Sequence, residues 1–404
     1  MKRSEIKIRM KVFIVTCDPF PNGMASTNRI RCYCKSLIKA GVKCEVVVFH
    51  RTEVYGSSPR NTEGNGVFEG IPFRYIGGTP LRASNVIVRK LNDLLDRANL
   101  LRFLRRNVKP EDAIFTYYRQ NSIERALLPY AKRRGWRIYQ ELCEYPYATG
   151  QVDSSVEAKC KKYMTTTFRQ YTGAVCISQP LLDLARKYHP QGEYIKVPIL
   201  IDEENLDFST INPKKLDASY IFHSGALYQQ KDGIIDVLNA FADALPQLPQ
   251  GTKYFFTGKM ESSRDCEKIS KTINERRLKD SVVFLGYLKT QDLMEYTKGA
   301  SLFIVYKNEN IQNKYCFATK LGEYLLSGNP VIITDVGEAL CYLENGKNAY
   351  VVEHSNRKQL ADTIVKALVN TEVSRAIGQA GQTTAKENFC CEVQSKALKT
   401  FFEK

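Results

Sequence analysis

The chain has 404 residues, of which 43% are hydrophobic and 25% charged, a composition that excludes a disordered protein and favours two folded domains. No run of eighteen apolar residues occurs and the N-terminus lacks a signal-peptide pattern, so neither a spanning helix nor secretion is expected. The net charge of +16 lies in the first half, because residues 1–200 hold 34 Lys/Arg against 17 Asp/Glu, which indicates an acidic partner for that half.

The 12 cysteines are scattered, and no pair of Cys-x-x-Cys motifs or neighbouring histidine cluster accompanies them. This spacing argues against a zinc site and favours free thiols in a cytoplasmic protein. We therefore expect no metal and no cofactor. We also find no zinc finger, glycine-aromatic RNA motif or basic tail, so a nucleic-acid partner is not expected.

Apolar runs of strand length alternate with helical patterns along the chain. These runs are 11–16, 44–49, 113–118, 137–140, 174–178 and 194–199, then 219–225, 253–258, 281–286, 301–306, 330–335 and 349–353. Continuous apolar strands between helices are typical of parallel sheets covered on both faces. The sequence therefore predicts an α/β protein with two doubly wound, Rossmann-like domains of six or so strands each. The predicted segments are 1–200, 201–385 and a C-terminal helix in 386–404 that packs back on the first domain.

Residues 81–108 combine apolar and basic positions in a helical pattern. The apolar positions are Val86, Val88, Leu91, Leu94, Leu95, Ala98, Leu101 and Leu104, and the flanking basic residues are Arg82, Arg89, Lys90, Arg97, Arg102, Arg105 and Arg106. Basic amphipathic helices are typical of elements at an anionic membrane surface. The alternative is that the apolar side packs on the first sheet while the arginines are solvated.

Three predicted strands of the second half end in glycine, at Gly225, Gly258 and Gly286. Open α/β sheets bind ligands at the carboxyl ends of their strands, and glycine there lets a ligand approach the backbone. A helix that begins near Ala318 or Thr319 and ends at Gly328 would direct free amides towards the same edge, which suits phosphate. Glu323 lies about one turn into this helix and is either a ligand for ribose hydroxyls or a solvated helix charge.

The stretch GEYLLSGNPVIITDVGE, at 322–338, resembles the carboxyl half of the signature of retaining glycosyltransferases of family four, which have the GT-B fold. HSGALYQQKDGIIDVLNAF (223–241), VVFLGYL (282–288) and ENGKNAYVVE (344–353) resemble further blocks of that family. FPNGMASTNRIRCYCKSLIKAG (20–41) resembles its amino-terminal loop and first helix. The resemblance covers roughly residues 11–390 and implies two domains facing a cleft, an acceptor domain first and a donor domain second.

The resemblance also implies roles for single residues. Glu323 matches the second glutamate of the family's E-x7-E motif, which binds ribose, and Lys231 matches the basic residue at the donor diphosphate. The resemblance gives Gly23 and Leu285 to Tyr287 further donor contacts. Together with the residues at the strand ends and the helix start, the predicted donor-binding residues are Gly23, Gly225, Lys231, Gly258, Leu285, Gly286, Tyr287, Phe317, Ala318, Thr319, Lys320 and Glu323. Lys231 is the expected catalytic cation, and Glu141 and Glu144 are candidates to position the acceptor. The sequence departs from the family at Tyr315, in place of the first motif glutamate, and at Ala226, in place of an arginine.

The function implied is metal-independent transfer of a sugar, with retention, from a UDP- or GDP-sugar to a glycan or lipid-diphosphate-linked acceptor in polysaccharide biosynthesis. The absence of an Asp-x-Asp pair agrees with a metal-free reaction. An anionic membrane surface is a further expected partner, at the inner membrane face, because it would explain the basic first half. Two alternatives stay open: a non-catalytic nucleotide-sugar-binding subunit and a GT-B sugar-nucleotide epimerase.

Overall fold

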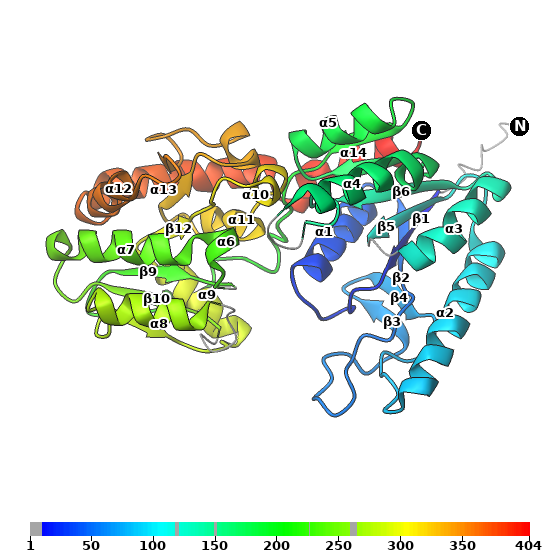
Figure 1. Cartoon of the computed structure of the whole chain (residues 1–404), viewed down its shortest axis with the longest axis horizontal. Helices are drawn as coiled ribbons and strands as arrows, with labels where there is room; N and C mark the ends of the chain where they lie inside the picture. Colours follow the sequence, from blue (N-terminus) through cyan, green and yellow to red (C-terminus); the bar gives the residue numbers. More distant parts are fainter. Residues whose placement is uncertain (1–9, 118–120, 149–151, 226, 259–264) are drawn as a thin grey trace, which may run out of the picture. The chain divides into compact units, whose positions relative to one another are not determined.

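The computed structural model describes residues 10–117, 121–148, 152–225, 227–258 and 265–404, which form two compact units (Figure 1). Unit 1 combines Met1–Cys143, Ala158–Asp202 and Cys391–Lys404, and unit 2 combines Glu144–Glu157 with Glu203–Cys390. The division after Asp202 lies two residues beyond the predicted boundary. The short segment Glu144–Glu157 belongs to unit 2, although the sequence places it among the residues of the first domain.

An eight-stranded sheet forms the centre of unit 1, in the order β3-β4-β2-β1-β5-β6-β7-β8. All neighbouring strands are parallel except β3 and β4, which form an antiparallel hairpin. The central strands β1, β2, β5, β6 and β7 are almost fully buried, as expected of strands with helices on both faces, whereas β4 and β8 towards the two ends of the sheet are partly exposed. The strands are β1 (Lys11–Thr16), β2 (Lys43–Val48), β3 (Asn65–Phe68), β4 (Ile71–Tyr75), β5 (Ala113–Tyr117), β6 (Arg137–Leu142), β7 (Gly173–Cys176) and β8 (Glu193–Lys196).

Helices from both ends of the chain cover this sheet. The C-terminal helix belongs to unit 1, where Phe402 lies against Phe115 of β5 and Tyr139 of β6, with ring centroids 5.5 and 5.4 Å away. The unit 1 helices are α1 (Ala25–Lys39), α2 (Val86–Asn107), α3 (Asn121–Arg134), α5 (Gln179–Tyr188) and α14 (Ser395–Phe402), with 3-10 helices Phe168–Gln170 and Cys391–Gln394. Helix α4 (Ser154–Thr166) begins in unit 2 and ends in unit 1.

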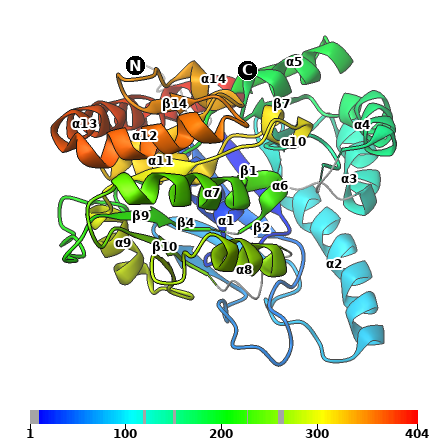
Figure 2. The same ribbon diagram turned by 60° about the vertical axis from the view of Figure 1, so that its left-hand side comes forward.

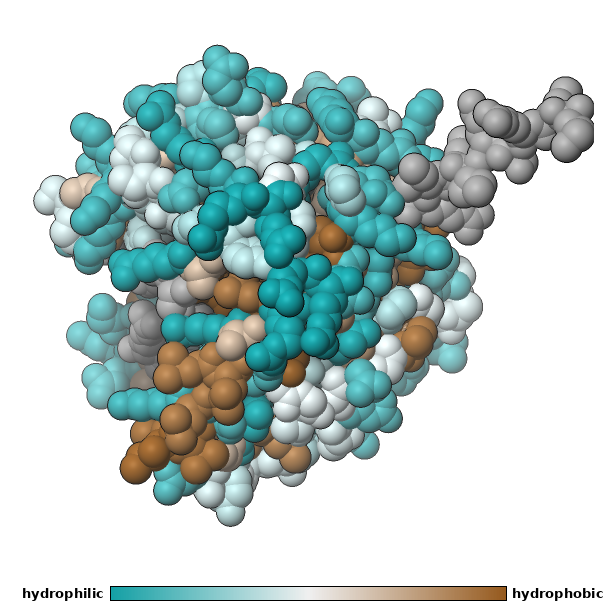
Figure 3. All heavy atoms as spheres, turned by 90° about the vertical axis from the view of Figure 1, so that its right-hand side faces the viewer, coloured by the Kyte–Doolittle hydropathy of each residue, from teal (hydrophilic) through white to brown (hydrophobic). Residues whose placement is uncertain are grey.

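Helix α2 lies at the periphery of unit 1 (Figures 1 and 2). Its second half is anchored, because Leu100 and Leu104 are buried and Phe103 packs edge-on against Phe13 of β1. The first half instead exposes its apolar side chains, which gather at the lower left of Figure 3. The interpretation that the whole apolar side packs on the sheet is therefore wrong for the first half of the helix.

Unit 2 has two three-stranded parallel sheets, β11-β10-β9 and β12-β13-β14. A parallel bridge between Ile221 and Leu302 joins β9 to the start of β12, so the strands follow one another as a six-stranded array. The predicted strand runs of the second half all contain an observed strand. These strands are β9 (Tyr220–His223), β10 (Lys253–Phe256), β11 (Val282–Phe284), β12 (Phe303–Val305), β13 (Val331–Thr334) and β14 (Tyr350–Val352).

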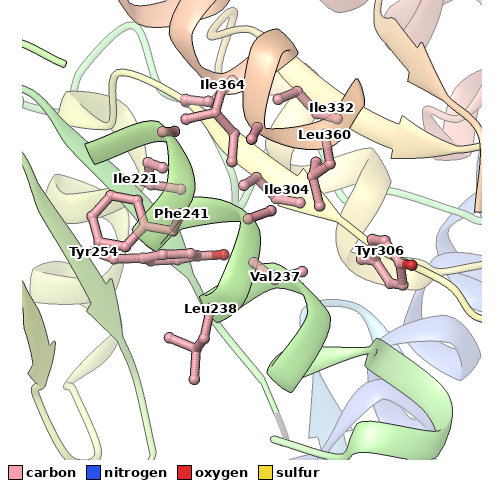
Figure 4. Close-up of a cluster of buried hydrophobic side chains, with 14 of the residues drawn as sticks. Ile221, Val237, Leu238, Phe241, Tyr254, Ile304, Tyr306, Ile332, Leu360 and Ile364 are labelled. Carbon is pink, nitrogen blue, oxygen red and sulfur yellow. The ribbon is translucent and has the colours of Figure 1, made fainter. Parts of the chain in front are cut away.

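The core of unit 2 lies between its sheet and the paired helices α7 and α12 (Figure 4). Phe241 of α7 and Ile364 of α12 are fully buried over Ile304 and Ile332 of the central strands. The unit 2 helices are α6 (Gln229–Asp232), α7 (Ile234–Ala244), α8 (Cys266–Glu275), α9 (Thr290–Gly299), α10 (Ile311–Tyr315), α11 (Thr319–Leu326), α12 (Arg357–Val369) and α13 (Thr371–Asn388), with 3-10 helices Leu245–Gln247 and Glu338–Cys341. In the part of the chain that the structure describes, no helix is long and apolar enough to cross a bilayer.

Candidate functional site

Three glycines lie in a row at the carboxyl edge of the unit 2 sheet. The amide of Gly258 donates to the carbonyl of Gly286 at 2.6 Å, and a Cβ on Gly258 would lie 3.6 Å from the carbonyl oxygen of Gly225. All three have positive φ angles, of 148°, 87° and 68° for Gly225, Gly258 and Gly286. Because side chains are strained at such angles, these positions favour glycine and leave the backbone of the edge open to a ligand.

Helix α11 is fixed to the same edge through one tyrosine. The amide of Ser224, which precedes Gly225, donates to the hydroxyl of Tyr324 at 2.8 Å, and the Tyr324 ring stacks on Phe303 of β12 at 4.1 Å. Ala318 occupies the N-cap position and its side chain makes no capping hydrogen bond. The first amides of α11, beginning at the exposed Thr319, are therefore available to an anionic ligand. The helix starts at Thr319 as predicted, and it ends at Leu326, two residues before the predicted Gly328.

Glu323 is half-buried one turn into α11, and its carboxylate accepts a hydrogen bond from the ammonium group of Lys320 at 2.7 Å. Burial acts to lower the pKa of Lys320, but the Glu323 carboxylate outweighs it and raises this pKa. Lys320 is therefore positively charged and half-exposed beside the helix start. The pair offers a cation and a carboxylate side by side, which suits a phosphate and a neighbouring diol.

Lys231 lies on the short helix α6, with its ammonium group 3.9 Å from the carboxylate of Glu144. Both side chains are about one third exposed, at 37% and 36%, so they remain accessible. Burial raises the pKa of the Cys316 thiol, and the positive charges of Lys307 and Lys231 oppose this rise. Hydrogen bonds link α6 to the residues before α11, because the side-chain amide of Asn313 donates to the carbonyl of Lys231 at 3.0 Å and the Cys316 thiol donates to the carbonyl of Asn313 at 3.8 Å. The structure thus brings Lys231, Glu144 and the α11 residues together in unit 2.

Three asparagines that the sequence analysis missed hold α6 in place. The side-chain amides of Asn308, Asn310 and Asn313 donate to the carbonyls of Gln229, Gln230 and Lys231, at 2.7, 3.0 and 3.0 Å. Three consecutive carbonyls of this four-residue helix therefore each have an asparagine partner. The signal that would have revealed this clamp is the spacing of three asparagines directly after the strand of residues 303–305.

We expect Asn313→Ala to loosen α6, because Asn313 is buried and its amide also donates to the carbonyl of Asn308 at 2.9 Å. Losing these bonds leaves two partly buried carbonyls without their partner, which costs about 1–3 kcal/mol. Hydrogen exchange of the amides in 228–233 should accelerate and the denaturation midpoint should fall. Asn370→Ala is the matched control, since its side-chain amide donates to the carbonyl of Lys366 at 3.2 Å, an exposed bond outside α6 that water replaces. Equal protection in both variants would contradict the clamp.

The other predicted residues around α11 differ in accessibility. Phe317 is 5% exposed and its ring stacks on Tyr342, so its side chain belongs to the core. Only the backbone of Phe317 is available at the start of α11. Leu285 is half-buried, and Tyr287, which follows Gly286, is 77% exposed. The ring of Tyr287 is therefore accessible to a planar group. Tyr315, in place of the first motif glutamate, lies 4.8 Å from the ring of Tyr145. Ala226 lies outside the described residues.

Glu141 does not have the surroundings expected of a residue that positions an acceptor. It is 3% exposed inside unit 1, where Nε of Arg29 donates to one carboxylate oxygen at 2.7 Å and the hydroxyl of Tyr33 donates to the other at 2.8 Å. Burial raises the pKa of Glu141, and the charge of Arg29 opposes this rise. Both oxygens are engaged within the core, so these contacts favour a structural role for Glu141 over the predicted role in positioning an acceptor.

Gly23 lies in unit 1, in the loop before α1. A Cβ at this position would lie 1.9 Å from the hydroxyl oxygen of Thr27, which itself donates to the carbonyl of Pro19 at 2.7 Å. The tight loop therefore requires glycine for local packing. No group of three or more metal-ligating side chains occurs among the described residues.

Residues 205–384 match the family model described as glycosyl transferases group 1, a segment that lies within unit 2 and covers less than half of the chain. Spore coat protein SA of Bacillus subtilis (strain 168) is 23% identical over 171 residues, which are 42% of this chain and 44% of that protein. The matched segment thus spans less than half the length of this curated relative.

Solved structures match nearly the whole chain. They include sucrose-phosphate synthase from Thermosynechococcus elongatus, with a TM-score of 0.71 at 15% identity over 98% of both chains. Anabaena HepE in complex with UDP-glucose has a TM-score of 0.65 at 14% identity over 97% of this chain and 99% of that one. At these identities the likeness establishes the fold, which is GT-B with two Rossmann-like domains. Unit 2 is thus similar to the glycosyl transferases group 1 model, and the whole chain shares its fold with these solved structures.

Proposed function

We propose that this protein is a retaining glycosyltransferase of family four that moves a sugar from a UDP- or GDP-sugar to a glycan or lipid-diphosphate-linked acceptor in polysaccharide assembly. The observation that carries the proposal is the carboxyl edge of the unit 2 sheet. There, three glycines open the backbone, α11 presents uncapped amides, and Lys231 and Lys320 supply positive charge. Such an edge suits a nucleoside diphosphate better than a neutral ligand.

The chemistry follows from where charge develops. As the bond between the sugar and the diphosphate breaks, positive charge grows on the sugar ring and negative charge on the leaving phosphate. Lys231 and the amides of α11 stabilise the leaving diphosphate electrostatically. Glu323 holds the nucleotide through its ribose hydroxyls, Gly286 and Tyr287 border the base, and Glu144 keeps Lys231 oriented at 3.9 Å.

A panel of UDP- and GDP-sugars, each incubated with the protein and a range of acceptors, tests the proposal. Transfer with retention, or slow hydrolysis of one donor, supports it, and persistence of this activity in EDTA supports a metal-free reaction. Interconversion of the sugar would identify an epimerase instead. Loss of activity in EDTA would contradict the metal-free mechanism.

We expect Glu323→Ala to weaken nucleotide binding by about 1.5–3 kcal/mol, the contribution of a hydrogen bond to a charged group. Isothermal calorimetry with UDP and GDP measures this change. Glu344→Ala is the matched control, because Glu344 pairs with Lys347 at the same three-residue spacing and 3.1 Å, on an exposed surface. Unchanged nucleotide affinity together with a lower melting temperature would make Glu323 a structural residue.

One observation favours a second candidate, a nucleotide-sugar-binding subunit without transferase activity. Tyr315 occupies the position of the first motif glutamate and packs on Tyr145, so an aromatic surface replaces a carboxylate near the expected sugar. The same panel distinguishes the two functions. Tight binding of one nucleotide-sugar without hydrolysis or transfer would favour the binding subunit.

A further inference from the structure

The first half of α2 exposes a stripe of large apolar side chains that no other element of the described chain covers. We call this stripe the α2 patch. Its members are between 42% and 70% exposed, and they are Val86, Ile87, Val88, Leu91, Leu94 and Leu95. Isolated exposed apolar residues are ordinary, but a contiguous group of this size on one helix marks an interaction surface.

The opposite side of α2 is the side that holds the helix to unit 1. Asp96, Leu100 and Leu104, spaced at four-residue intervals, are buried, and Asp96 pairs with Arg51 at 3.4 Å. The α2 patch recurs at spacings of three and four, through Ile87, Leu91 and Leu94, on the other side of the cylinder. Because the buried side of α2 packs on unit 1, the α2 patch on the opposite side faces solvent.

The exposed side continues beyond the α2 patch with basic residues. Following the same three- and four-residue spacing from Leu94, the positions are Ala98, then Arg102, Arg105 and Arg106, all exposed. A neighbouring loop extends the apolar area, because Leu81 bridges to Glu53 and the adjacent Val54 and Tyr55 are 58% and 69% exposed. The hydrophobic cluster at the lower left of Figure 3 corresponds to this region.

We propose that the α2 patch docks unit 1 onto an anionic lipid bilayer, with α2 lying in the plane of the interface. Its apolar half enters the boundary between headgroups and acyl chains, and Arg102, Arg105 and Arg106 contact the anionic headgroups. A bilayer combines both properties of this surface, because it is apolar inside and anionic outside. A second copy of the chain is a poorer partner, since the same basic side would face itself and repel.

The proposal rests on unit 1 alone and does not depend on the proposed function. Sedimentation of the full chain with phosphatidylcholine vesicles, with and without phosphatidylglycerol, measures the docking. We expect binding to the anionic vesicles that falls as salt rises from about 0.1 M to about 1 M, where the Debye length shrinks from about 10 to about 3 Å. Equal binding to both vesicle types, or to neither, would overturn the proposal.

Two variants test the α2 patch and the basic residues that follow it. We expect Leu91→Glu/Leu94→Glu to weaken partition about tenfold or more without loss of fold, because both side chains already face solvent at 54% and 61% exposure. Arg105→Gln/Arg106→Gln should weaken it by a similar factor and flatten the salt dependence. Circular dichroism reports whether each variant is folded.

The matched controls come from unit 2. Val369→Glu/Val373→Glu places the same charges at apolar positions of similar exposure, 53% and 54%, and should leave vesicle binding within about twofold of wild type. Full binding by Leu91→Glu/Leu94→Glu would overturn the proposal. The proposal would also be overturned if the wild-type protein bound no vesicles but formed a dimer that Leu91→Glu/Leu94→Glu abolishes. A second copy of the chain would then cover the α2 patch.

Discussion

Lys231→Ala is expected to lower kcat for sugar transfer by about 100- to 1000-fold, the loss seen when one preorganised electrostatic donor is removed. Donor affinity should change much less, because negative charge on the leaving diphosphate grows only as the glycosidic bond breaks. The structure places this ammonium group 3.9 Å from Glu144, on a helix held by three asparagines, so its position is defined before the donor binds. Steady-state kinetics with the donor found in the panel measure kcat and KM separately.

Lys271→Ala is the matched control for this prediction. Lys271 forms a comparable lysine–glutamate pair with Glu275, at 3.7 Å on an exposed helix of unit 2, and the mechanism assigns it no role. Its replacement should leave kcat within about twofold. An unchanged kcat in Lys231→Ala with only a raised KM would show that Lys231 contributes equally to ground state and transition state.

Buried parallel strands were the most predictable part of the fold. Every apolar run named from the sequence overlaps an observed strand, because strands covered on both faces need continuous apolar side chains. The hairpin of β3 and β4 was missed, since its burial alternates and its strands are short. Its turn at Glu69 and Gly70 has positive φ angles of 49° and 77°, a feature that Glu-Gly does not signal strongly.

The parts of the candidate site formed by backbone at strand and helix ends were predictable from the sequence. The parts formed by side-chain contacts between distant segments were not. The edge glycines and the start of α11 follow from strand and helix ends, which leave local signals. The asparagine clamp on α6 joins segments 79 to 82 positions apart, so the three closely spaced asparagines are visible in the sequence but their partners on α6 are not. Glu141 shows the same limit, because its partner Arg29 precedes it by 112 positions.

Charge on its own does not tell a solvated glutamate from a buried one. Glu141 and Glu144 are three residues apart, yet the first is 3% exposed in unit 1 and the side chain of the second is 36% exposed in unit 2. The difference arises because Glu141 is still within β6, with its side chain towards α1, while Glu144 lies beyond the strand end. A one-residue register difference in a strand reverses the face of a side chain, and sequence spacing alone does not fix that register.

Glu141→Ala is expected to destabilise unit 1 by about 3–5 kcal/mol, because it leaves the Arg29 guanidinium buried without its carboxylate. Arg29 is 4% exposed and also donates to the carbonyls of Val197 and Pro198, at 2.9 and 2.6 Å, so it has no route to solvent. Chemical denaturation of the variant against wild type measures the change in unfolding free energy.

Glu392→Ala is the control, since Glu392 pairs with Lys39 in the same unit but is largely exposed, and its loss should cost no more than about 1 kcal/mol. The double variant Arg29→Met/Glu141→Leu should be less destabilised than the sum of its single changes, because no unpaired charge then remains buried. Glu141→Gln separates the structural role from an acceptor role. A Glu141→Gln protein that keeps its wild-type stability but loses transfer would reverse the structural assignment, because only a contact with substrate would explain that combination.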